Sequence, residues 1–337
     1  MCHLFNERRR MRTVVLFFVC VLFLPACDKT RSVSPTLQKV NLAYTGQPQS
    51  ALMHIAIEKG FFRDEGLDVH GTIFELGRAA MTSMLKGDDD IASVAETPIM
   101  YHVVKGGEIS IFANIVTTNT NNGILARQDA GIQRPEDLKG KRVGFPKGTT
   151  AEFFLSAMLS AHGLEMSDIH PVYLKPNELQ TAIMDDLVDA ISIWNYKLAL
   201  IADALGFNGI VFLDKELYTE SFNLVCQPDY TKRHPEVLEA LLRGLLRAEK
   251  FSLTHLLESQ EIMSRRTQVP LKTVQKVWPE FKFKISLAPT LLITLDDEAR
   301  WALQNHFVEA TAEPDFLSHI YFDALRTVKP EAIKFRQ

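Results

Sequence analysis

Beyond its first forty residues, the sequence alternates between strand-like and helix-like segments, and this alternation restricts the fold more than any other feature. Residues 67–73 alternate apolar and polar side chains, which is the period of a half-buried strand. Leu52, Ile55 and Ala56 lie at helical spacing and would form one apolar face. Alternation of this kind implies open parallel sheets with helices on their faces. We therefore expect an α/β protein.

The alternation runs twice along the chain, and the second series begins near Pro135. From residue 235 to residue 253, leucines recur at helical spacing, and the rest of the chain is expected to be largely helical. Two series predict two α/β lobes, with chain crossings near residues 118–123 and 221–223. The expected division is a signal peptide at 1–26, a tether at 27–38, a first lobe made of 39–118 and 223–337, and a second lobe at 119–222.

The N-terminus has the pattern of an exported lipoprotein. Arginines precede a short apolar run at residues 13–23, which is shorter than the roughly 20 residues that span a bilayer. The run leads to the sequence LPAC, which resembles a bacterial lipobox and implies acylation of Cys27, with palmitate among the acyl chains. By resemblance to Gram-negative lipoproteins, Asp28 implies retention at the inner membrane. The alternative is an ordinary signal peptide with an incidental cysteine.

Composition excludes several classes of function. The net charge of −4 and the pI of about 6.2 argue against nucleic-acid binding, which needs a basic face. No later apolar run is long enough to span a membrane. After removal of the signal, only Cys27 and Cys226 remain, so acylation of Cys27 leaves no internal disulfide. We find no metal-ligand spacing, phosphate loop or nucleophile elbow, and we expect no metal, no cofactor and no enzymatic activity.

Several segments resemble solute-binding proteins of ABC importers for nitrate, sulfonates and taurine. The matching segments are YTGQPQSALMHIAIEKGFFRDEGLDV, LKGDDDIASVAETPIM, GIQRPEDLKGKRVGFPKGTTAEFFL, VDAISIWNYKLALIA and HPEVLEALLRGLL, of which the third is the most specific. The resemblance spans about residues 39–257 and implies a type II periplasmic-binding-protein fold, with two lobes, a cleft and a hinge. A related branch that makes thiamine pyrimidine relies on a cysteine-rich motif, which the lone Cys226 does not provide.

The resemblance also implies a function. The protein would be the extracytoplasmic solute-binding component of an ABC importer, held by its lipid anchor at the periplasmic face of the inner membrane. It would act as a monomer, close its lobes on a solute and pass the solute to the permease subunits. The solutes implied are an alkanesulfonate or taurine, nitrate, or a thiamine-precursor pyrimidine. The alternative is a ligand-binding lipoprotein receptor with a membrane signalling partner, and the sequence does not choose between the two.

The candidate site follows from a general rule and from the resemblance together. In open α/β sheets, ligands bind outside the carboxyl ends of the strands. The loops that follow the expected strands, which match the ligand-contacting loops of the family, contain these candidates: Gln47, Gln49, Glu75, Arg78, Glu96, Thr97, Gly148, Thr149, Thr150, Trp194, Asn195 and Tyr196.

Two of these segments have a specific chemistry. Gly148, Thr149 and Thr150 lie at a helix start, where free N–H groups and the helix dipole suit an anion or a carbonyl oxygen. Thr149 and Glu152 could instead form a capping box. Trp194 could pack on a planar or methylene-rich ligand, or belong to the core. Many relatives carry an acid where this chain has an asparagine after the tryptophan, which weakens the case for a cationic ligand group.

The remaining candidates each have a functional and a structural interpretation. Gln47 and Gln49 could form hydrogen bonds across a cleft, or lie in a solvated loop. Arg78 could pair with a sulfonate, nitrate or carboxylate, or be a surface arginine. Glu75 and Glu96 could hold an amine or a ring N–H, or be solvated or capping acids. Pro98 is expected only to open a helix.

Overall fold

The computed structural model describes residues 37–309 and 314–335. The expected signal peptide, Cys27 and the tether as far as residue 36 lie outside the described residues. Among the described residues, no helix is both long and apolar enough to cross a membrane.

Six strands form the first sheet, in the order β11-β4-β10-β3-β1-β2. Their bounds are Gln38–Thr45 for β1, Leu67–Phe74 for β2, Ile91–Ala95 for β3, Ser110–Thr118 for β4, Glu220–Cys226 for β10 and Lys282–Ser286 for β11. β1 pairs in parallel with β2 and β3, whereas β10 runs antiparallel to β3 and β4, and β11 antiparallel to β4. The expectation of purely parallel sheets is therefore wrong. β4 leads out of this sheet and β10 returns into it, so the two neighbours run in opposite directions.

Five strands form the second sheet, in the order β7-β6-β8-β5-β9. Their bounds are Asn122–Arg127 for β5, Arg142–Phe145 for β6, His170–Tyr173 for β7, Ala190–Trp194 for β8 and Gly209–Phe212 for β9. β6 pairs in parallel with β7 and β8, and β5 runs antiparallel to β8 and β9. This sheet is also mixed.

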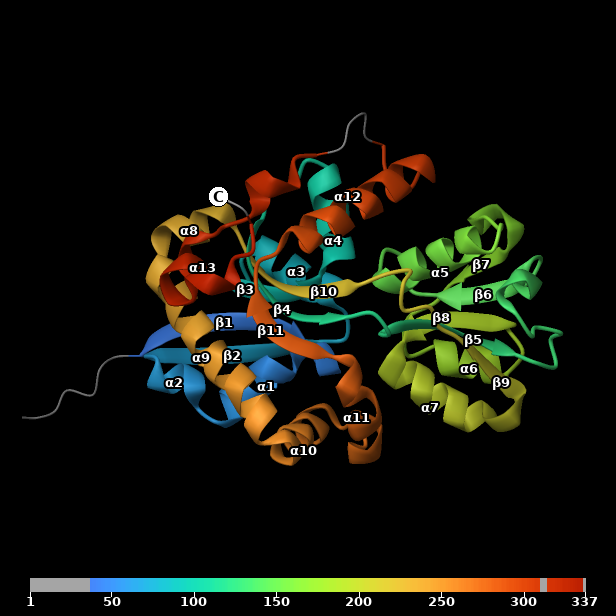
Figure 1. Cartoon of the computed structure of the whole chain (residues 1–337), viewed down its shortest axis with the longest axis horizontal. Helices are drawn as coiled ribbons and strands as arrows, with labels where there is room; N and C mark the ends of the chain where they lie inside the picture. Colours follow the sequence, from blue (N-terminus) through green and yellow to red (C-terminus); the bar gives the residue numbers. More distant parts are fainter. Residues whose placement is uncertain (1–36, 310–313, 336–337) are drawn as a thin grey trace, which may run out of the picture. The chain divides into compact units, whose positions relative to one another are not determined.

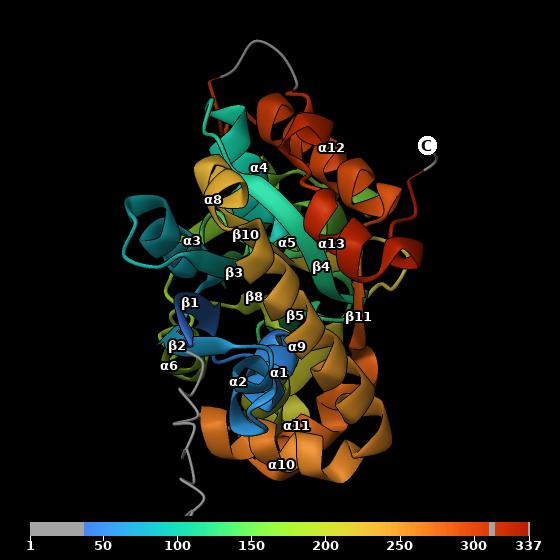
Figure 2. The same cartoon turned by 90° about the vertical axis from the view of Figure 1, so that its left-hand side faces the viewer.

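Helices cover both sheets. We call the first sheet and its helices the large lobe, and the second sheet with α5, α6 and α7 the small lobe. In the large lobe, α3, α4 and α12 lie on one face of the sheet and α1 and α9 on the other (Figures 1 and 2). In the small lobe, α5 lies opposite α6 and α7 (Figure 1). The helix bounds are Ala51–Glu58 for α1, Phe61–Asp64 for α2, Gly77–Lys86 for α3, Glu96–Val104 for α4, Thr150–Ala161 for α5, Leu179–Met184 for α6, Asn195–Leu205 for α7, Pro228–Arg233 for α8, Pro235–Thr254 for α9, Leu256–Thr267 for α10, Leu271–Val277 for α11, Pro289–Gln304 for α12 and Asp323–Val328 for α13.

Helix α9 buries the leucines that recur at helical spacing in its sequence. Leu238, Leu241, Leu242 and Leu245 recur at helical spacing and are all fully buried. One apolar face of a long helix therefore packs into the large-lobe core, and α1 and α2 are among its neighbours. Burial of each leucine side chain contributes about 2 kcal/mol to the stability of the lobe.

Three local expectations were wrong. β5 was not expected as a strand, and β11 was not expected in the largely helical tail. α4 begins at Glu96, so Pro98 is its third residue and does not open it. Proline fits there because the first turn of a helix leaves its N–H groups without intrahelical partners.

Candidate functional site

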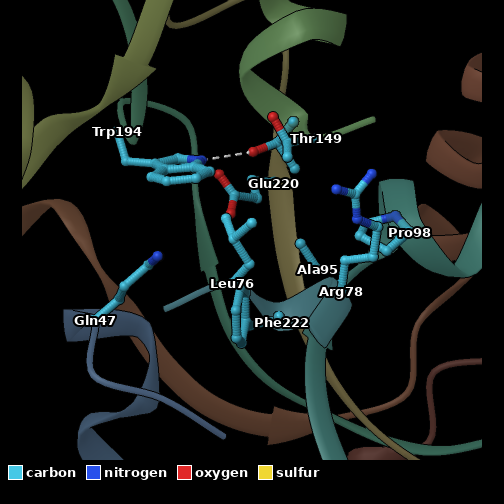
Figure 3. A pocket seen from close by; sticks show the side chains of 11 residues that line it. Gln47, Leu76, Arg78, Ala95, Pro98, Thr149, Trp194, Glu220 and Phe222 are labelled. Atoms are coloured by element: carbon cyan, nitrogen blue, oxygen red, sulfur yellow. Dashed lines mark hydrogen bonds between the residues drawn. The ribbon is translucent and has the colours of Figure 1, made fainter. Parts of the chain in front are cut away.

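A small chamber, here called the inner chamber, lies where the two lobes meet (Figure 3). It has room for about 20 Å³, close to the volume that one water needs. Several lining residues stand at or just beyond the carboxyl ends of strands, as the rule for open α/β sheets predicts. The lining residues are Gln47, Leu76, Gly77, Arg78, Ala95, Pro98, Thr149, Thr150, Trp194, Glu220 and Phe222.

The small-lobe wall is held by a chain of hydrogen bonds. The indole Nε1 of Trp194 donates to Thr150 Oγ1 at 2.9 Å, and this hydroxyl donates to Asn122 Oδ1 at 3.0 Å. Trp194 is buried at the end of β8, and its side chain reaches the inner chamber (Figure 3). Because its N–H already has a partner, the indole offers a ligand its ring surface rather than a donor.

The start of α5 does not contain the capping box that the sequence allowed. The Thr149 hydroxyl donates to the Pro146 carbonyl at 2.7 Å and caps no helical N–H. Glu152 Oε2 accepts from the Gly148 N–H at 2.6 Å, one residue before the N-cap. Among the described residues, the N-cap side chain makes no hydrogen bond to this helix, and the Glu152 and Phe153 N–H groups already donate to the Thr149 carbonyl at 3.1 and 3.3 Å. The N–H groups that stay available to a ligand are therefore those of Thr150 and Ala151.

Gly148 also lies at a contact between the lobes. Its φ of 70° lies in the left-handed region that favours glycine. A Cβ at this position would lie 2.9 Å from Arg78 Nη1 in the large lobe. The same Arg78 Nη1 donates to the Lys147 carbonyl at 3.1 Å. Glycine is therefore favoured here by the backbone conformation, whereas the Arg78 guanidinium, at the end of a flexible side chain, could move away from a Cβ.

Three buried glutamates stand beside the inner chamber, and we call them the carboxyl cluster: Glu96, Glu220 and Glu298. Glu220 Oε2 accepts from the side-chain amides of Asn121 and Asn122, both at 2.7 Å. Burial raises the pKa of Glu220 to about 7. Among the described residues, none of the three glutamates has a cationic partner, so the cluster carries less negative charge than three ordinary carboxylates.

The other two members of the carboxyl cluster bond within the protein. Glu96 accepts from the Ser221 N–H at 2.8 Å and from the Tyr218 hydroxyl. Burial, with Glu298 and Glu220 nearby, raises the pKa of Glu96 well above its ordinary value. Glu298 accepts from the Thr97 hydroxyl, and burial raises its pKa as well. Glu96 and Thr97 were predicted as ligand contacts. In the structure their side chains form hydrogen bonds within the protein, and neither residue lines the inner chamber.

Five of the twelve predicted candidates line the inner chamber: Gln47, Arg78, Thr149, Thr150 and Trp194. The others lie around it. Glu75 is exposed and faces Lys197 at 3.8 Å. Gly148 lines a second cavity, and Tyr196 is buried at the start of α7.

Among the described residues, two buried side-chain amides make no hydrogen bond of ordinary geometry. They are Gln49, which lies beside Glu220, and Asn195, which follows Trp194. An unpaired buried amide costs about 1–3 kcal/mol, which a ligand with matching polar groups would recover. Neither residue lines the inner chamber, so their role as contacts stays a prediction.

The twelve candidates do not include Glu220, Phe222, Leu76, Gly77 or Ala95, which also line the inner chamber. Glu220 stands where the chain returns to the large lobe, and its partners Asn121 and Asn122 lie 99 and 98 residues away in the sequence. Ala95 ends β3, and Leu76 and Gly77 follow β2, so these three lie in the loops to which the strand-end rule points, but without a polar side chain they were not among the candidates.

The lobes also meet away from the inner chamber. Trp301 of α12 donates through Nε1 to Ser156 Oγ of α5 at 2.8 Å. Its ring packs edge-on against Phe153 with centroids 5.1 Å apart. The two crossing segments between the lobes touch as well, because Asn119 Nδ2 donates to the Lys215 carbonyl at 3.1 Å. These contacts and the small inner chamber correspond to a closed arrangement.

Two α/β lobes, with strand ends from both facing one chamber, define the periplasmic-binding-protein fold. Solved structures support this. The alkanesulfonate-binding protein SsuA of Xanthomonas axonopodis pv. citri aligns with a TM-score of 0.72 over 84% of this chain and 98% of that chain, at 17% identity. The nitrate-binding protein NrtA of Synechocystis PCC 6803 aligns with a TM-score of 0.71 over 88% of this chain and 89% of that chain, at 15% identity.

The chain belongs to the NMT1/THI5-like family, whose model matches residues 47–256. A Bacillus subtilis (strain 168) protein named "Putative aliphatic sulfonates-binding protein" is 28% identical over 273 residues, which are 79% of this chain and 82% of that protein. The taurine-binding periplasmic protein of Escherichia coli (strain K12) is 23% identical over 63% of this chain and 67% of its own length. Among the described residues, no group of three or more histidine, cysteine or acidic side chains is placed to hold a metal ion.

Proposed function

We propose that this protein is the extracytoplasmic solute-binding component of an ABC importer. The observation that supports this most directly is the inner chamber, which both lobes line at the carboxyl ends of their strands. The relatives named for binding sulfonates, taurine and nitrate support the same role and suggest the solute classes: an alkanesulfonate or taurine, or nitrate. A thiamine-precursor pyrimidine is a further candidate from the family. These relatives are binding proteins, so we propose capture without covalent chemistry.

In the proposed cycle, the lobes part, a solute enters, and the lobes close around it. Opening would separate Arg78 from the Lys147 carbonyl and Trp301 from Ser156, because each pair joins one lobe to the other. In the solute-bound form, whose inner chamber would be wider than the 20 Å³ of this closed arrangement, the ring of Trp194 and the free N–H groups at the start of α5 would contact the solute. A solute that binds only the closed form would shift the protein toward it. The closed monomer would then dock on the permease.

The solutes carried by the protein itself test the proposed function. Protein purified under native conditions from its own cells would be denatured, and the small molecules released would be identified by mass spectrometry. We expect one polar metabolite at nearly one molecule per protein, and its re-addition should raise the unfolding temperature. Absence of any released solute, together with no binding from a cell-extract metabolite pool, would contradict capture.

We further propose that Cys27 is acylated and anchors the protein at the periplasmic face of the inner membrane. A signal pattern ahead of the LPAC sequence supports this. Cys27→Ser should move nearly all of the protein from the membrane fraction to the soluble periplasmic fraction, because the acceptor sulfur is lost. Immunoblots of the two fractions would measure the change. Cys226→Ser serves as the control, since that thiol is buried in β10, and equal membrane retention of both variants would refute the anchor.

A further inference from the structure

A second and larger cavity, here called the outer chamber, lies next to the inner chamber and shares Arg78 and Pro98 with it. Its volume is about 450 Å³, within the range of small-molecule sites. The inner chamber, with room for about one water, is much smaller. The residues that line the outer chamber are Arg78, Met81, Thr82, Leu85, Pro98, Tyr101, His102, Lys105, Lys147, Gly148, His306 and Phe307.

The charge of the outer chamber is one-sided. Five of its lining side chains are basic, and none is acidic: Arg78, His102, Lys105, Lys147 and His306. Within the described residues, no ion pair neutralises Arg78, Lys105 or Lys147. This gathering of unpaired cations occurs in a chain whose net charge is −4. A concave wall with one sign of charge concentrates ions of the other sign.

One carboxyl group stands behind this wall and offsets little of the charge. Glu152 accepts from the Gly148 N–H at 2.6 Å and does not line the outer chamber. Burial raises the pKa of Glu152, which favours its neutral form. The positive charge of Arg78, Lys105 and Lys147 therefore exceeds the negative charge that the buried Glu152 contributes.

Apolar surface completes the outer chamber. Tyr101 and Phe307 contribute aromatic rings, and Met81, Leu85 and Pro98 contribute aliphatic groups. Lys105 Nζ lies 5.7 Å from the centre of the Tyr101 ring, so cation and ring face the same space. Inorganic anions such as sulfate would use the charges but none of this apolar surface. An organic anion would use both.

We propose that the outer chamber binds the anionic part of the captured solute, which is therefore an organic anion with a flat or apolar body. The proposal rests on the proposed function, because it names the class of solute. Lys147 and Gly148 belong to the small lobe and the other lining residues to the large lobe. An anion held there would contact both lobes and stabilise their closed arrangement.

Paired charge variants test the proposal. Lys105→Gln/Lys147→Gln removes two cations from the outer chamber without touching the inner one. Lys250→Gln/Lys272→Gln removes the same charge at two exposed positions on α9 and α11 that line neither chamber. Calorimetry at low ionic strength would compare benzoate and phenyl phosphate with benzamide, which is the neutral analogue of benzoate.

We expect the wild type and the α9/α11 control to bind both aryl anions, and benzamide to bind at least tenfold more weakly, by about 1.4 kcal/mol. The outer-chamber variant should bind the anions about tenfold more weakly than the wild type, and added salt should weaken its binding less. Equal affinity of the two double variants would overturn the proposal. So would failure of both aryl anions to bind the wild type, or a neutral solute released from the purified protein. In each of these outcomes, a solute identified by mass spectrometry would still support solute capture. Failure of the outer-chamber proposal can therefore be distinguished from failure of the proposed function.

Discussion

Glu220→Gln is expected to reduce the loss of stability that the wild type shows as pH rises from about 5 to about 8, a loss to which Glu96 and Glu298 also contribute. The Glu220 carboxyl has a pKa of about 7 in the folded protein against an ordinary value of 4.5, because it is buried. Folding therefore takes up a proton between these values. The stability this group contributes is fully present below pH 4.5 and is lost as pH rises through 7. Over that window the loss is about 3 kcal/mol, and an uncharged glutamine would not show it.

Urea unfolding at a series of pH values would measure how the free energy of unfolding of each variant depends on pH. Glutamine keeps an oxygen that can accept from Asn121 and Asn122, so the variant should still fold. Glu331→Gln, at an exposed position near the end of the described chain, is the matched control and should follow the wild-type curve. Parallel curves for Glu220→Gln and the wild type would show that this carboxyl does not take up the proton. Glu96 or Glu298 would then be responsible.

Trp194→Ala is expected to weaken solute binding by about a hundredfold. The indole is buried at the inner chamber, and a central aromatic side chain typically contributes 2 kcal/mol or more to binding. The change also leaves Thr150 Oγ1 without the donor that Trp194 supplies. Titration calorimetry with the solute released from the wild type would measure the affinity. Trp194→Phe should recover part of it, because a ring surface returns without the N–H.

The comparison that makes this prediction specific is Trp278→Phe. Trp278 is also buried, but it packs beside Phe283 in the large lobe and lines neither chamber. This variant should lose some thermal stability and keep its affinity. If Trp194→Ala lowered only the unfolding temperature and bound the solute as tightly as the wild type, Trp194 would belong to the core.

Much of the fold could be predicted from periodicity, because most helices have one apolar face and most strands stand between turn signals. A strand was expected at residues 67–73, and β2 has the bounds Leu67–Phe74. β5 was not predicted because it is buried along nearly its whole length, so its apolar residues do not alternate with polar ones. β11 does alternate, since Phe283 and Ile285 are buried while Lys282 and Lys284 are exposed, so periodicity does indicate this strand.

The candidate site could be predicted only as a set of loops. The strand-end rule places Gln47, Arg78 and Trp194 correctly beside one chamber, because it depends on topology alone. It says nothing of side chains that arrive from elsewhere in the chain. Trp301 reaches Ser156 across 145 residues of sequence, and Glu220 joins Asn122 across 98. Pairings at such separations leave no local pattern, so the contacts between lobes and the carboxyl cluster had to come from the structure.

The way the chain divides between its two sheets also sets the order in which the sheets can be completed as the chain emerges, N-terminus first. Every strand of the small-lobe sheet lies between residues 122 and 212, so this sheet is complete once that stretch has been synthesised. The strands β1 to β4 of the other sheet emerge earlier, yet β3 and β4 wait for β10, since Ser110 pairs with Cys226. The large-lobe sheet thus begins first and is completed last, and its β3 and β4 edges stay unpaired, and open to pairing with other chains, until β10 arrives.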